Sequence, residues 1–432
     1  MKSLLRTVVV AILTWEAKLV LKRRRPKIIA VTGSAGKTSS KDAIFAVLSH
    51  AELSVRKSEK SYNSEFGVPL TILGLESGWN SPWRWVVNMV QGLITAFGSD
   101  PYPAWLVVEV GADRPGDIRR IARWLKPDIA VITSIPDIPV HVEYFHSPHA
   151  LAQEKRRLAE YMRPDGLLII NGDDTYTKHI HAEFADSAIT FGFEGQNAFV
   201  AKDVGIRYEE KKPVGMHFYC EHSNSRISVS IYGALGKPRV YAALCALAVA
   251  EAAGIALETA AEALAHFAPP PGRMRLLDGI RGSIIIDDTY NSSPAAALSA
   301  LETLKEIKGA KKRIAALGDM LELGRFSKIA HTQVGEEAKK SADLLITVGF
   351  RAKEIGQVAL NQGMPEANIR AYDQHESVRA GKELEPELKE GVVVLVKGSQ
   401  GMRMEKTVLE IMAEPERAED LLVRMDADWR DR

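Results

Sequence analysis

The string Thr32-Gly33-Ser34-Ala35-Gly36-Lys37-Thr38-Ser39 constrains the fold of this chain more than any other feature. It follows a short β-type run, residues 27–31, and precedes a helical pattern in which Ile44, Val47 and Leu48 share one face. A strand, a glycine-rich turn, Lys-Thr and a helix are the parts of a phosphate-binding loop. The glycines let backbone N–H groups approach a phosphate, and the helix N-terminus adds a favourable dipole. The string therefore predicts a nucleotide site.

Two side chains of this loop carry specific expectations. Lys37 can reach the β- and γ-phosphates of a nucleotide, and the Thr38 hydroxyl can take a Mg²⁺ position. The spacing is shorter than the general G-x-x-x-x-G-K-[ST] pattern because residue 31 is Val. A tight strand-to-helix turn without a ligand is the alternative for the glycines alone. A generic P-loop ATPase or GTPase is a further alternative, although no string here resembles a GTPase base-recognition motif.

The pattern along the chain predicts an α/β fold. Between residues 27 and 190, apolar runs alternate with helical stretches, which predicts a mostly parallel sheet with helices on both faces. Strict alternation in Ile227-Ser228-Val229-Ser230-Ile231 predicts antiparallel strands within residues 196–232. Residues 240–267 predict a helix pair broken at Gly254. The expected strands are 105–110, 129–133, 166–170, 284–287, 314–317, 344–348 and 392–396, and the expected helices 118–125 and 150–162.

A linker signal divides the chain into two large parts. Pro269-Pro270-Pro271-Gly272 interrupts the pattern, and the α/β alternation restarts after it. We expect a basic amphipathic N-terminal segment over residues 1–26, a central nucleotide-binding P-loop domain over 27–268, and a Rossmann-like C-terminal α/β domain over 269–432. The charged tail after about residue 414 is expected to fray.

Charge and composition exclude some classes of function. The formal net charge of +1 gives no electrostatic case for nucleic-acid binding, and the 46% apolar content is that of an ordinary globular protein. Two cysteines far apart in sequence fit a reducing cytoplasm without a disulfide framework. The sequence makes no prediction of the oligomeric state.

Two apolar segments raise the question of a membrane surface. Residues 1–25 are apolar, with an uninterrupted run (residues 7–15) too short to span a bilayer, and they end in Lys22-Arg23-Arg24-Arg25. Within residues 79–97, three tryptophans (Trp79, Trp83 and Trp85) precede and begin an apolar stretch. Peripheral contact with the inner face of the membrane through both segments is one interpretation. Packing against the protein's own flank or a partner is the other.

Further short strings appear in a fixed order after the loop. They are Asn63-Ser64-Glu65-Phe66-Gly67-Val68-Pro69, Glu109-Val110-Gly111-Ala112-Asp113-Arg114-Pro115-Gly116, His141-Val142-Glu143-Tyr144-Phe145, Gly272-Arg273-Met274, Asp287-Asp288-Thr289-Tyr290-Asn291, Gly318-Asp319-Met320-Leu321-Glu322-Leu323-Gly324 and Lys397-Gly398-Ser399-Gln400-Gly401-Met402-Arg403. The series resembles the Mur ligase family of ATP-dependent amide-bond ligases over residues 27–410. Within that family it is most similar to members that join D-Ala-D-Ala to a UDP-linked muramyl tripeptide.

The resemblance implies a catalytic set in the central domain. ATP would convert a carboxylate to an acyl phosphate, which an amine then attacks. Phosphoryl transfer to a carboxylate brings two anions together, so cations are needed. Lys37 and a Mg²⁺ held by Thr38 and Glu109 would supply them, His141 would bind a second Mg²⁺, and Lys155 resembles the family's carbamylated lysine. His141-x-Glu143-x-x-His146 differs from the zinc motif H-E-x-x-H.

The resemblance also assigns residues to the remaining ligands. Tyr290 and Asn291 would hold the adenine, with Asp288 near the ribose and Arg273 near the phosphates. Substrate-binding positions are Asn63 and, for the incoming amine, Asp319, Glu322, Lys397 and Ser399. The sequence departs from the family pattern at three of the nearby positions, Ser293, Ala295 and Gln400.

These assignments predict an ATP- and Mg²⁺-dependent ligase of peptidoglycan precursor synthesis. A muramyl-peptide-like acid and a D-Ala-D-Ala-like amine are the expected substrates. The family members most similar to this chain carry a separate domain before the loop that binds the UDP end, whereas here about 26 residues precede the first strand, so we expect that domain to be missing. Ligase chemistry on a different, lipid-linked acid and a catalytically silent ATP-binding protein stay open as alternatives.

Overall fold

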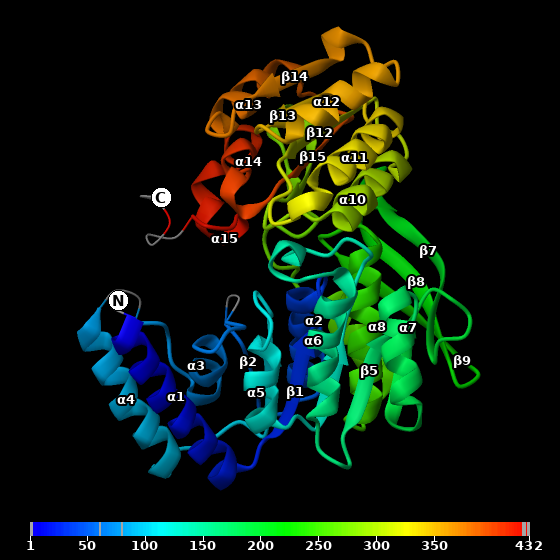
Figure 1. Cartoon of the computed structure of the whole chain (residues 1–432). Helices are drawn as coiled ribbons and strands as arrows, with labels where there is room; N and C mark the ends of the chain where they lie inside the picture. Colours follow the sequence, from blue (N-terminus) through cyan, green and yellow to red (C-terminus); the bar gives the residue numbers. More distant parts are fainter. Residues whose placement is uncertain (1–2, 60–61, 79–80, 426–428, 430–432) are drawn as a thin grey trace.

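The computed structural model describes residues 3–59, 62–78, 81–425 and 429. In this part of the chain two β-sheets form two lobes, each with helices on both faces (Figure 1). The first sheet extends from β1 (Lys27–Thr32) to β9 (Ser225–Tyr232), and the second from β10 (Arg275–Asp278) to β15 (Val392–Lys397). The predicted α/β class is therefore confirmed. The chain passes from one sheet to the other around the Pro269–Pro271 stretch, while the exact domain limits stay a prediction.

The first sheet has the strand order β2-β3-β1-β4-β5-β6-β7-β8-β9 in the described residues. The pairs from β2 to β7 are parallel, and β7, β8 and β9 pair antiparallel, as the alternation over 196–232 predicts. Its other strands are β2 (Val55–Lys57), β3 (Trp105–Glu109), β4 (Ile129–Ile132), β5 (Leu167–Asn171), β6 (Ala188–Gly192), β7 (Phe199–Glu209) and β8 (Lys212–His222). The helices of this lobe are α1 (Ser3–Arg24), α2 (Lys37–His50), α3 (Gly67–Leu73), α4 (Pro82–Phe97), α5 (Asp117–Leu125), α6 (Pro148–Glu160), α7 (Thr175–Glu183), α8 (Lys237–Ala252) and α9 (Leu257–Ala265).

Strand β1 shows why the central strands read as continuous apolar runs. Successive side chains of a strand point to opposite faces of the sheet. Ile28 and Ala30 join a core that includes α1, α3, α5 and α6, whereas Ile29 and Val31 join a core that includes α2 and α8. Because both faces of the sheet are covered, every residue of β1 after Lys27 is buried.

The second sheet has the order β10-β11-β15-β12-β13-β14 in the described residues, and only β10 pairs antiparallel. Its remaining strands are β11 (Ile284–Asp288), β12 (Lys312–Gly318), β13 (Leu344–Val348) and β14 (Ile369–Tyr372). Its helices are α10 (Pro294–Glu306), α11 (Ser327–Ser341), α12 (Ala352–Asn361), α13 (Ser377–Leu384), α14 (Glu405–Ile411) and α15 (Ala418–Leu421). The predicted strands of both lobes are confirmed to within a few residues.

Strand register brings polar residues to the edge of each sheet that faces the other lobe. Glu109, at the end of β3, lies opposite Val31 of β1, immediately before the loop. In the second sheet Asp288 at the end of β11 lies opposite Lys397 at the end of β15. Ligands of open α/β sheets bind outside the carboxyl ends of the strands. The two carboxyl-end edges therefore frame one candidate site.

Both ends of the chain pack against the protein in the described residues. The N-terminal segment is a helix, α1, that packs beside α4 at the left edge of the first lobe (Figure 1). No helix in the described part of the chain is long and apolar enough to cross a membrane. Up to residue 425 the tail is folded, contrary to the expectation that it frays after about residue 414, because α15 forms and Arg424 pairs with the buried Glu405 at 2.8 Å.

Candidate active site

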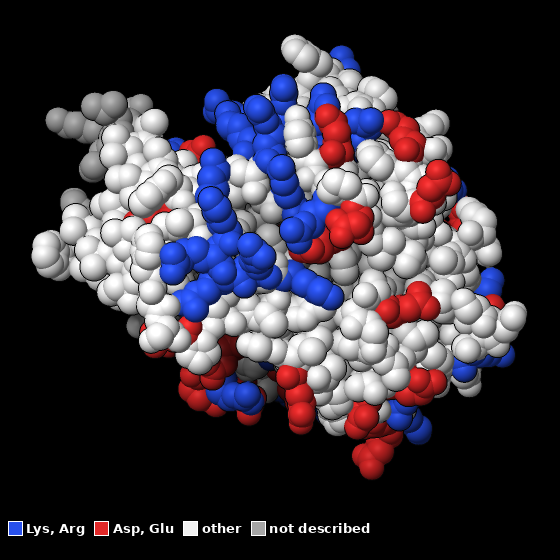
Figure 2. Space-filling view, turned by 90° about the horizontal axis from the view of Figure 1, so that it is seen from below, with Lys and Arg blue, Asp and Glu red and all other residues white. Residues whose placement is uncertain are grey.

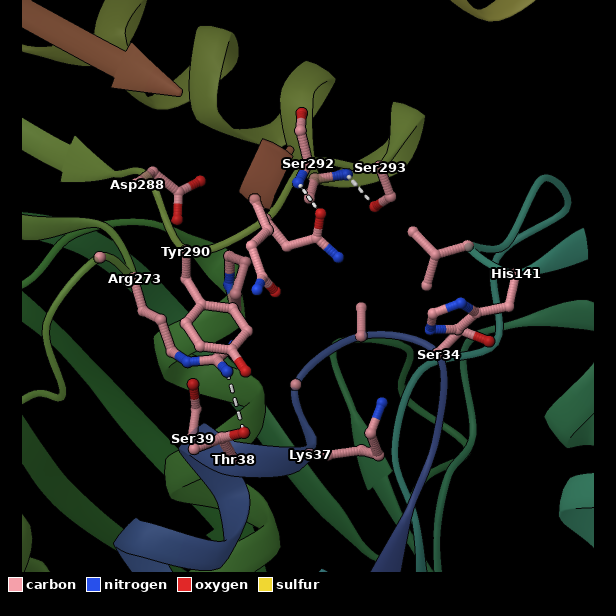
Figure 3. A pocket seen from close by; sticks show the side chains of 18 of the residues that line it. Ser34, Lys37, Thr38, Ser39, His141, Arg273, Asp288, Tyr290, Ser292 and Ser293 are labelled. Carbon is pink, nitrogen blue, oxygen red and sulfur yellow. Dashed lines mark hydrogen bonds between the residues drawn. The ribbon is translucent and has the colours of Figure 1, made fainter. Parts of the chain in front are cut away.

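A cavity of about 570 Å³ lies between the two lobes. It is lined by residues 34–39 of the glycine-rich loop, by the ends of β3 and β11, and by the first turn of α10. Figure 3 shows Lys37 entering this space from the loop, Arg273 and Tyr290 on one side, and His141 on the other. Fourteen of the predicted residues line it besides Lys37: Ser34, Ala35, Gly36, Thr38, Ser39, Asn63, Glu109, His141, Arg273, Asp288, Tyr290, Asn291, Glu322 and Lys397.

The backbone of the loop requires its glycines. Gly33 has φ +149° and Gly36 has φ +85°, a region that residues with a side chain rarely adopt. A Cβ atom on Gly33 would also overlap the hydroxyl of Thr133. That hydroxyl donates to the Ala35 carbonyl at 2.7 Å, which holds the loop against β4. Helix α2 then begins at Lys37, so the N–H groups of its first turn face the cavity, the usual geometry of a phosphate site.

Two lysines meet beneath the loop. Nζ of Lys37 and Nζ of Lys155 each donate to the carbonyl oxygen of Gly33 at 2.9 Å. Burial lowers the pKa of Lys37, with Glu109 opposing that shift. Burial, followed by the nearby Lys37, lowers the pKa of Lys155 well below its ordinary value. Lys155 does not line the cavity, because it lies behind Gly33 on α6.

A hydroxyl–carboxylate pair lies at the start of α2. Oγ1 of Thr38 donates to Oε2 of the buried Glu109 at 2.9 Å. The amide of Asn63 donates to the other carboxylate oxygen at 3.2 Å. These are hard oxygen ligands of the kind that Mg²⁺ prefers, and Mg²⁺ is usually held by one or two carboxylates together with substrate phosphates. No cluster of three His, Cys, Asp or Glu residues in the described chain could hold a metal ion by itself.

The C-terminal lobe contributes a guanidinium that crosses to the loop. Nη2 of Arg273 donates to Oγ1 of Thr38 at 2.9 Å, and its Cζ lies 4.0 Å from the centre of the Tyr290 ring (Figure 3). Next to it, Nζ of Lys397 donates to Oδ2 of Asp288 at 2.6 Å and to the Asn291 carbonyl at 3.0 Å. The stacked ring and the two cations are suited to a nucleotide base and its phosphates.

A second contact between the lobes lies at the far side of the cavity. Nδ1 of His141 lies 2.6 Å from Oε2 of Glu322, and Nε2 lies 3.8 Å from Asp113. The contact with His141 lowers the pKa of Glu322. The two side chains are in contact, although the angles at Nδ1 do not fit a hydrogen bond. A residue predicted for a metal and one predicted for the amine are therefore adjacent.

Two predicted amine-region residues lie away from the main cavity. Ser399 lines an adjoining cavity of about 720 Å³, which also includes His141 and Glu322. Asp319 is buried and lines neither cavity. Its carboxylate accepts a hydrogen bond from the backbone N–H of Ala352 at 2.7 Å and faces Arg351 at 3.8 Å. Asp319 therefore fixes the start of α12.

Two arginines at the site were not foreseen from the sequence. Arg239 is buried in α8, and its Nη2 donates to Ser39 at 2.8 Å. In the sequence, the only local pattern near it is Gly236 before a helix that starts with Lys-Pro-Arg. Burial lowers the pKa of Arg239 to about 10. Nη1 of Arg424 donates to the Tyr290 carbonyl at 3.0 Å, which supports the stacked ring from the tail of the chain. Its charged surroundings in sequence gave no signal.

A phosphate-binding loop in one lobe, closed by cations from a second α/β lobe, defines a protein that uses an ATP-type nucleotide between its domains. Comparison with known families agrees. Residues 99–250 match the Mur ligase middle domain, and residues 272–400 match the Mur ligase glutamate ligase domain. The chain belongs to the Mur ligase family of ATP-dependent peptide ligases.

Individual relatives extend the match beyond these two segments. UDP-N-acetylmuramoyl-tripeptide--D-alanyl-D-alanine ligase of Bacillus subtilis is 28% identical over 400 residues, covering 92% of this chain and 79% of that protein. The ligase of the same name from Escherichia coli is 26% identical, covering 88% and 76%. The crystal structure of MurF ligase from Thermotoga maritima in complex with ADP has a TM-score of 0.75 at 25% identity, covering 94% of this chain and 84% of that one.

Proposed function

We propose that this chain joins the carboxylate of a muramyl peptide to the amine of a D-Ala-D-Ala-like dipeptide, with conversion of ATP to ADP and phosphate. The observation that carries the proposal is the hydrogen bond from Arg273 in the second lobe to Thr38 in the loop of the first. This contact joins the loop to the second lobe across one cavity, which supports a nucleotide site and a second substrate-binding lobe that act together. The relatives named above support the two substrates, since their names state them.

The residues of the cavity suit the two steps of such a reaction. In the first step the carboxylate attacks the γ-phosphorus of ATP, giving an acyl phosphate and ADP. Lys37 and Arg273 lower the repulsion between the two anions, and the N–H groups at the start of α2 orient the phosphates. In the second step the amine attacks the acyl carbon, the C–O bond to phosphate breaks, and an amide and inorganic phosphate are released. Closure of the lobes excludes water from the acyl phosphate.

The donor set at Glu109 and Thr38 suits a Mg²⁺ ion bound together with the nucleotide. When bound, such an ion would neutralise charge on the phosphate oxygens. Asn63 orients the carboxylate of Glu109 through its amide. His141 is the candidate for a second ion, and it would have to turn from its contact with Glu322 to serve as a ligand.

Lys155 is proposed to carry a carbamate, formed when its amine adds to CO₂ and loses a proton. Lys37 and Lys155 donate to one buried carbonyl oxygen, and burial together with Lys37 lowers the pKa of Lys155 well below its ordinary value, which favours the neutral amine that reacts with CO₂. A carbamate at Lys155 would place a negative charge there, which would attract Lys37. Mass spectrometry of the intact protein with and without bicarbonate tests the modification.

The adjoining cavity is proposed to receive the incoming amine. It opens between Glu322 and Ser399 and is shared with His141 at the edge of the nucleotide cavity. The carboxylate of Glu322, whose pKa is lowered, would attract the ammonium form of the dipeptide by its charge. Asp319, whose carboxylate binds the start of α12 and whose carbonyl accepts from the Ser399 N–H at 3.0 Å, would act by positioning rather than by touching the substrate.

The test is phosphate release from ATP with UDP-muramyl-tripeptide and D-Ala-D-Ala, with the product identified by mass. We expect release that needs both substrates and a product heavier by one dipeptide residue. The same assay with a lipid-linked muramyl peptide tests the alternative acid. If ATP binds and neither acid yields phosphate or product, the chain is a silent nucleotide-binding protein and the proposal is wrong. We propose that the reaction takes place in the cytoplasm, where ATP is available.

A further inference from the structure

Helix α4 presents its large apolar side chains to solvent. Gly92 and Ala96, together with Asn88 and Trp85, face the protein and are buried. The opposite side exposes Trp83, Val86, Val87, Val90, Leu93, Ile94 and Phe97, with Trp83 73% and Phe97 57% accessible. A surface helix of a globular protein normally shows the reverse arrangement, with its apolar stripe toward the core. The outer side of α4 is therefore built for contact with something else.

Helix α1 extends the same surface. The two helices lie side by side and run in the same direction, since Arg24 at the end of α1 donates to the carbonyls of Thr95 and Gly98 at the end of α4. Trp15 of α1 is 56% exposed and Val8 is 46% exposed. We call the exposed side of α1 and α4 the apolar flank. It holds nine of the fourteen large apolar side chains that are exposed in the described residues.

Positive charge borders the apolar flank, and negative charge is almost absent from it. The only acid on α1 and α4 is Glu16, which is buried. Lys22, Arg23, Arg24 and Arg25 follow one another at the end of α1, and the Arg23 guanidinium lies 4.8 Å from the centre of the exposed Phe97 ring. From below, Lys and Arg side chains gather beside a nearly uncharged region at the left edge (Figure 2).

We propose that the apolar flank docks on the surface of an anionic lipid bilayer. Apolar and aromatic side chains bordered by cations suit the boundary between acyl chains and negatively charged headgroups. A second copy of the chain suits this surface less well, because it would bring the same cations against a surface with no exposed acid on either helix. Neither helix crosses a bilayer, so the contact is peripheral.

This docking would leave the nucleotide cavity open. Arg25 lies two residues before Lys27 at the start of β1, whereas the loop follows the other end of that strand. The cationic end of the apolar flank therefore lies at the amino-end edge of the first sheet, and the cavity at its carboxyl-end edge. The inference does not depend on the proposed substrates, because it rests on α1 and α4 alone.

Flotation of the full chain with lipid vesicles tests the proposal. One set is phosphatidylcholine alone, and the other contains about one quarter phosphatidylglycerol. We expect binding to the anionic vesicles at about 0.1 M salt, and at least about fivefold weaker binding at about 0.5 M salt or without phosphatidylglycerol. Binding to neither set, or equal binding to both at both salt concentrations, would overturn the proposal.

Two sets of exposed substitutions locate the contact. Val90→Ser, Ile94→Ser and Phe97→Ser combined should weaken vesicle binding by about tenfold or more. The matched set Ile329→Ser, Phe350→Ser and Leu360→Ser, on the other lobe, should not change it. Lys22→Gln, Arg23→Gln and Arg25→Gln should remove the anionic preference, whereas Lys305→Gln, Lys308→Gln and Lys340→Gln should keep it.

The same variants separate lipid docking from other occupants. Retained phosphate release and an unchanged melting temperature would show that the flank variants are folded. If the three serine substitutions abolish a concentration-dependent dimer and leave vesicle binding unchanged, the apolar flank is an interface between copies of this chain and the lipid proposal is wrong. Loss of vesicle binding in the control set would also contradict it.

Discussion

In the cavity between the lobes charged side chains are buried and paired, whereas along α1 and α4 large apolar side chains are exposed. Lys397, 2% exposed, binds Asp288, and Arg273 stacks on Tyr290 while it donates to Thr38. Trp83 and Phe97, in contrast, are 73% and 57% exposed. Burying charged groups and exposing large apolar groups both lower the free energy of unfolding, so neither arrangement is expected without a ligand or partner. The comparison supports two separate proposals, a polyanionic ligand for the cavity and a lipid surface for the two helices.

The largest effect is expected when the loop lysine is removed. Lys37→Ala should lower phosphate release by about 10³-fold, because no other side chain of the loop supplies a cation to the β- and γ-phosphates. Steady-state release under saturating ATP measures this. Lys178→Ala, which loses only an exposed ion pair with Glu194, is the matched control and should behave as the unaltered chain. Turnover that survives in Lys37→Ala would remove the loop from the mechanism.

The one acid of the α1–α4 pair should make stability depend on pH. Burial raises the pKa of Glu16 to about 7 from 4.5, and Oε2 has no hydrogen-bond partner among the described residues. A folded-state pKa above the unfolded value means that the folded chain binds the proton more tightly. Stability is therefore full below about pH 4.5 and falls as the pH rises through about 7.

Glu16→Gln should remove this dependence. We expect it to raise the free energy of unfolding by up to about 3 kcal/mol at pH 8, and to change it little at pH 5. Urea unfolding at the two pH values measures the difference. An equal effect at both values, or a loss of stability at pH 8, would show that the carboxylate is not held in an apolar setting.

The guanidinium that joins the two lobes should matter for ATP more than for the amine. Arg273→Ala should lower kcat/KM for ATP by about 10- to 50-fold, because the phosphates lose a cation and Tyr290 loses its stacking partner. Arg273→Lys should restore little of it, since an ammonium cannot both stack and reach Thr38. The KM for the dipeptide should stay nearly constant. A change confined to the KM for the dipeptide would contradict this assignment and show that Arg273 acts on the amine instead.

The smallest effect is expected at the contact between α1 and α4. Gly92 lets the two helices approach, because a Cβ atom there would overlap the Glu16 carboxylate. Gly92→Ala should lower the free energy of unfolding by about 1–2 kcal/mol. In a chain that already carries Glu16→Ala the same change should cost less, which a double-mutant cycle detects. Additive effects would mean that the two residues do not touch.

The sequence predicted those parts of the structure whose cause is local. Apolar runs such as residues 129–132 become strands because both faces of the sheet are covered, and the glycine-rich loop forms because Gly33 and Gly36 adopt backbone angles that other residues rarely adopt. The strings around Glu109, His141 and Arg273 predicted which residues line the cavity. They did not predict that His141 and Glu322 pair across the lobes, a contact set by how the two sheets face each other.

The sequence did not predict which side chains of a helix point toward the protein and which point toward solvent. The tryptophans near residue 80 were grouped as one apolar cluster, yet Trp83 is 73% exposed whereas Trp85 is 5% exposed and packs on Phe66. Trp79 lies outside the described residues. Periodicity shows that α4 is amphipathic but not which side meets the protein. Arg239 and Arg424 reach the site from distant segments, so no short sequence motif predicted their role.

The central claim is that ligase chemistry belongs to the cavity and not to the apolar flank. The most direct test is an assay, without vesicles, of phosphate release that depends on both acid and amine. It is run on two variants, Lys37→Ala and the combined Val90→Ser, Ile94→Ser, Phe97→Ser chain. The account predicts that the first variant loses this release and that the second retains it within about twofold. Retention in the first variant, or loss in the second while it stays folded, would contradict the account.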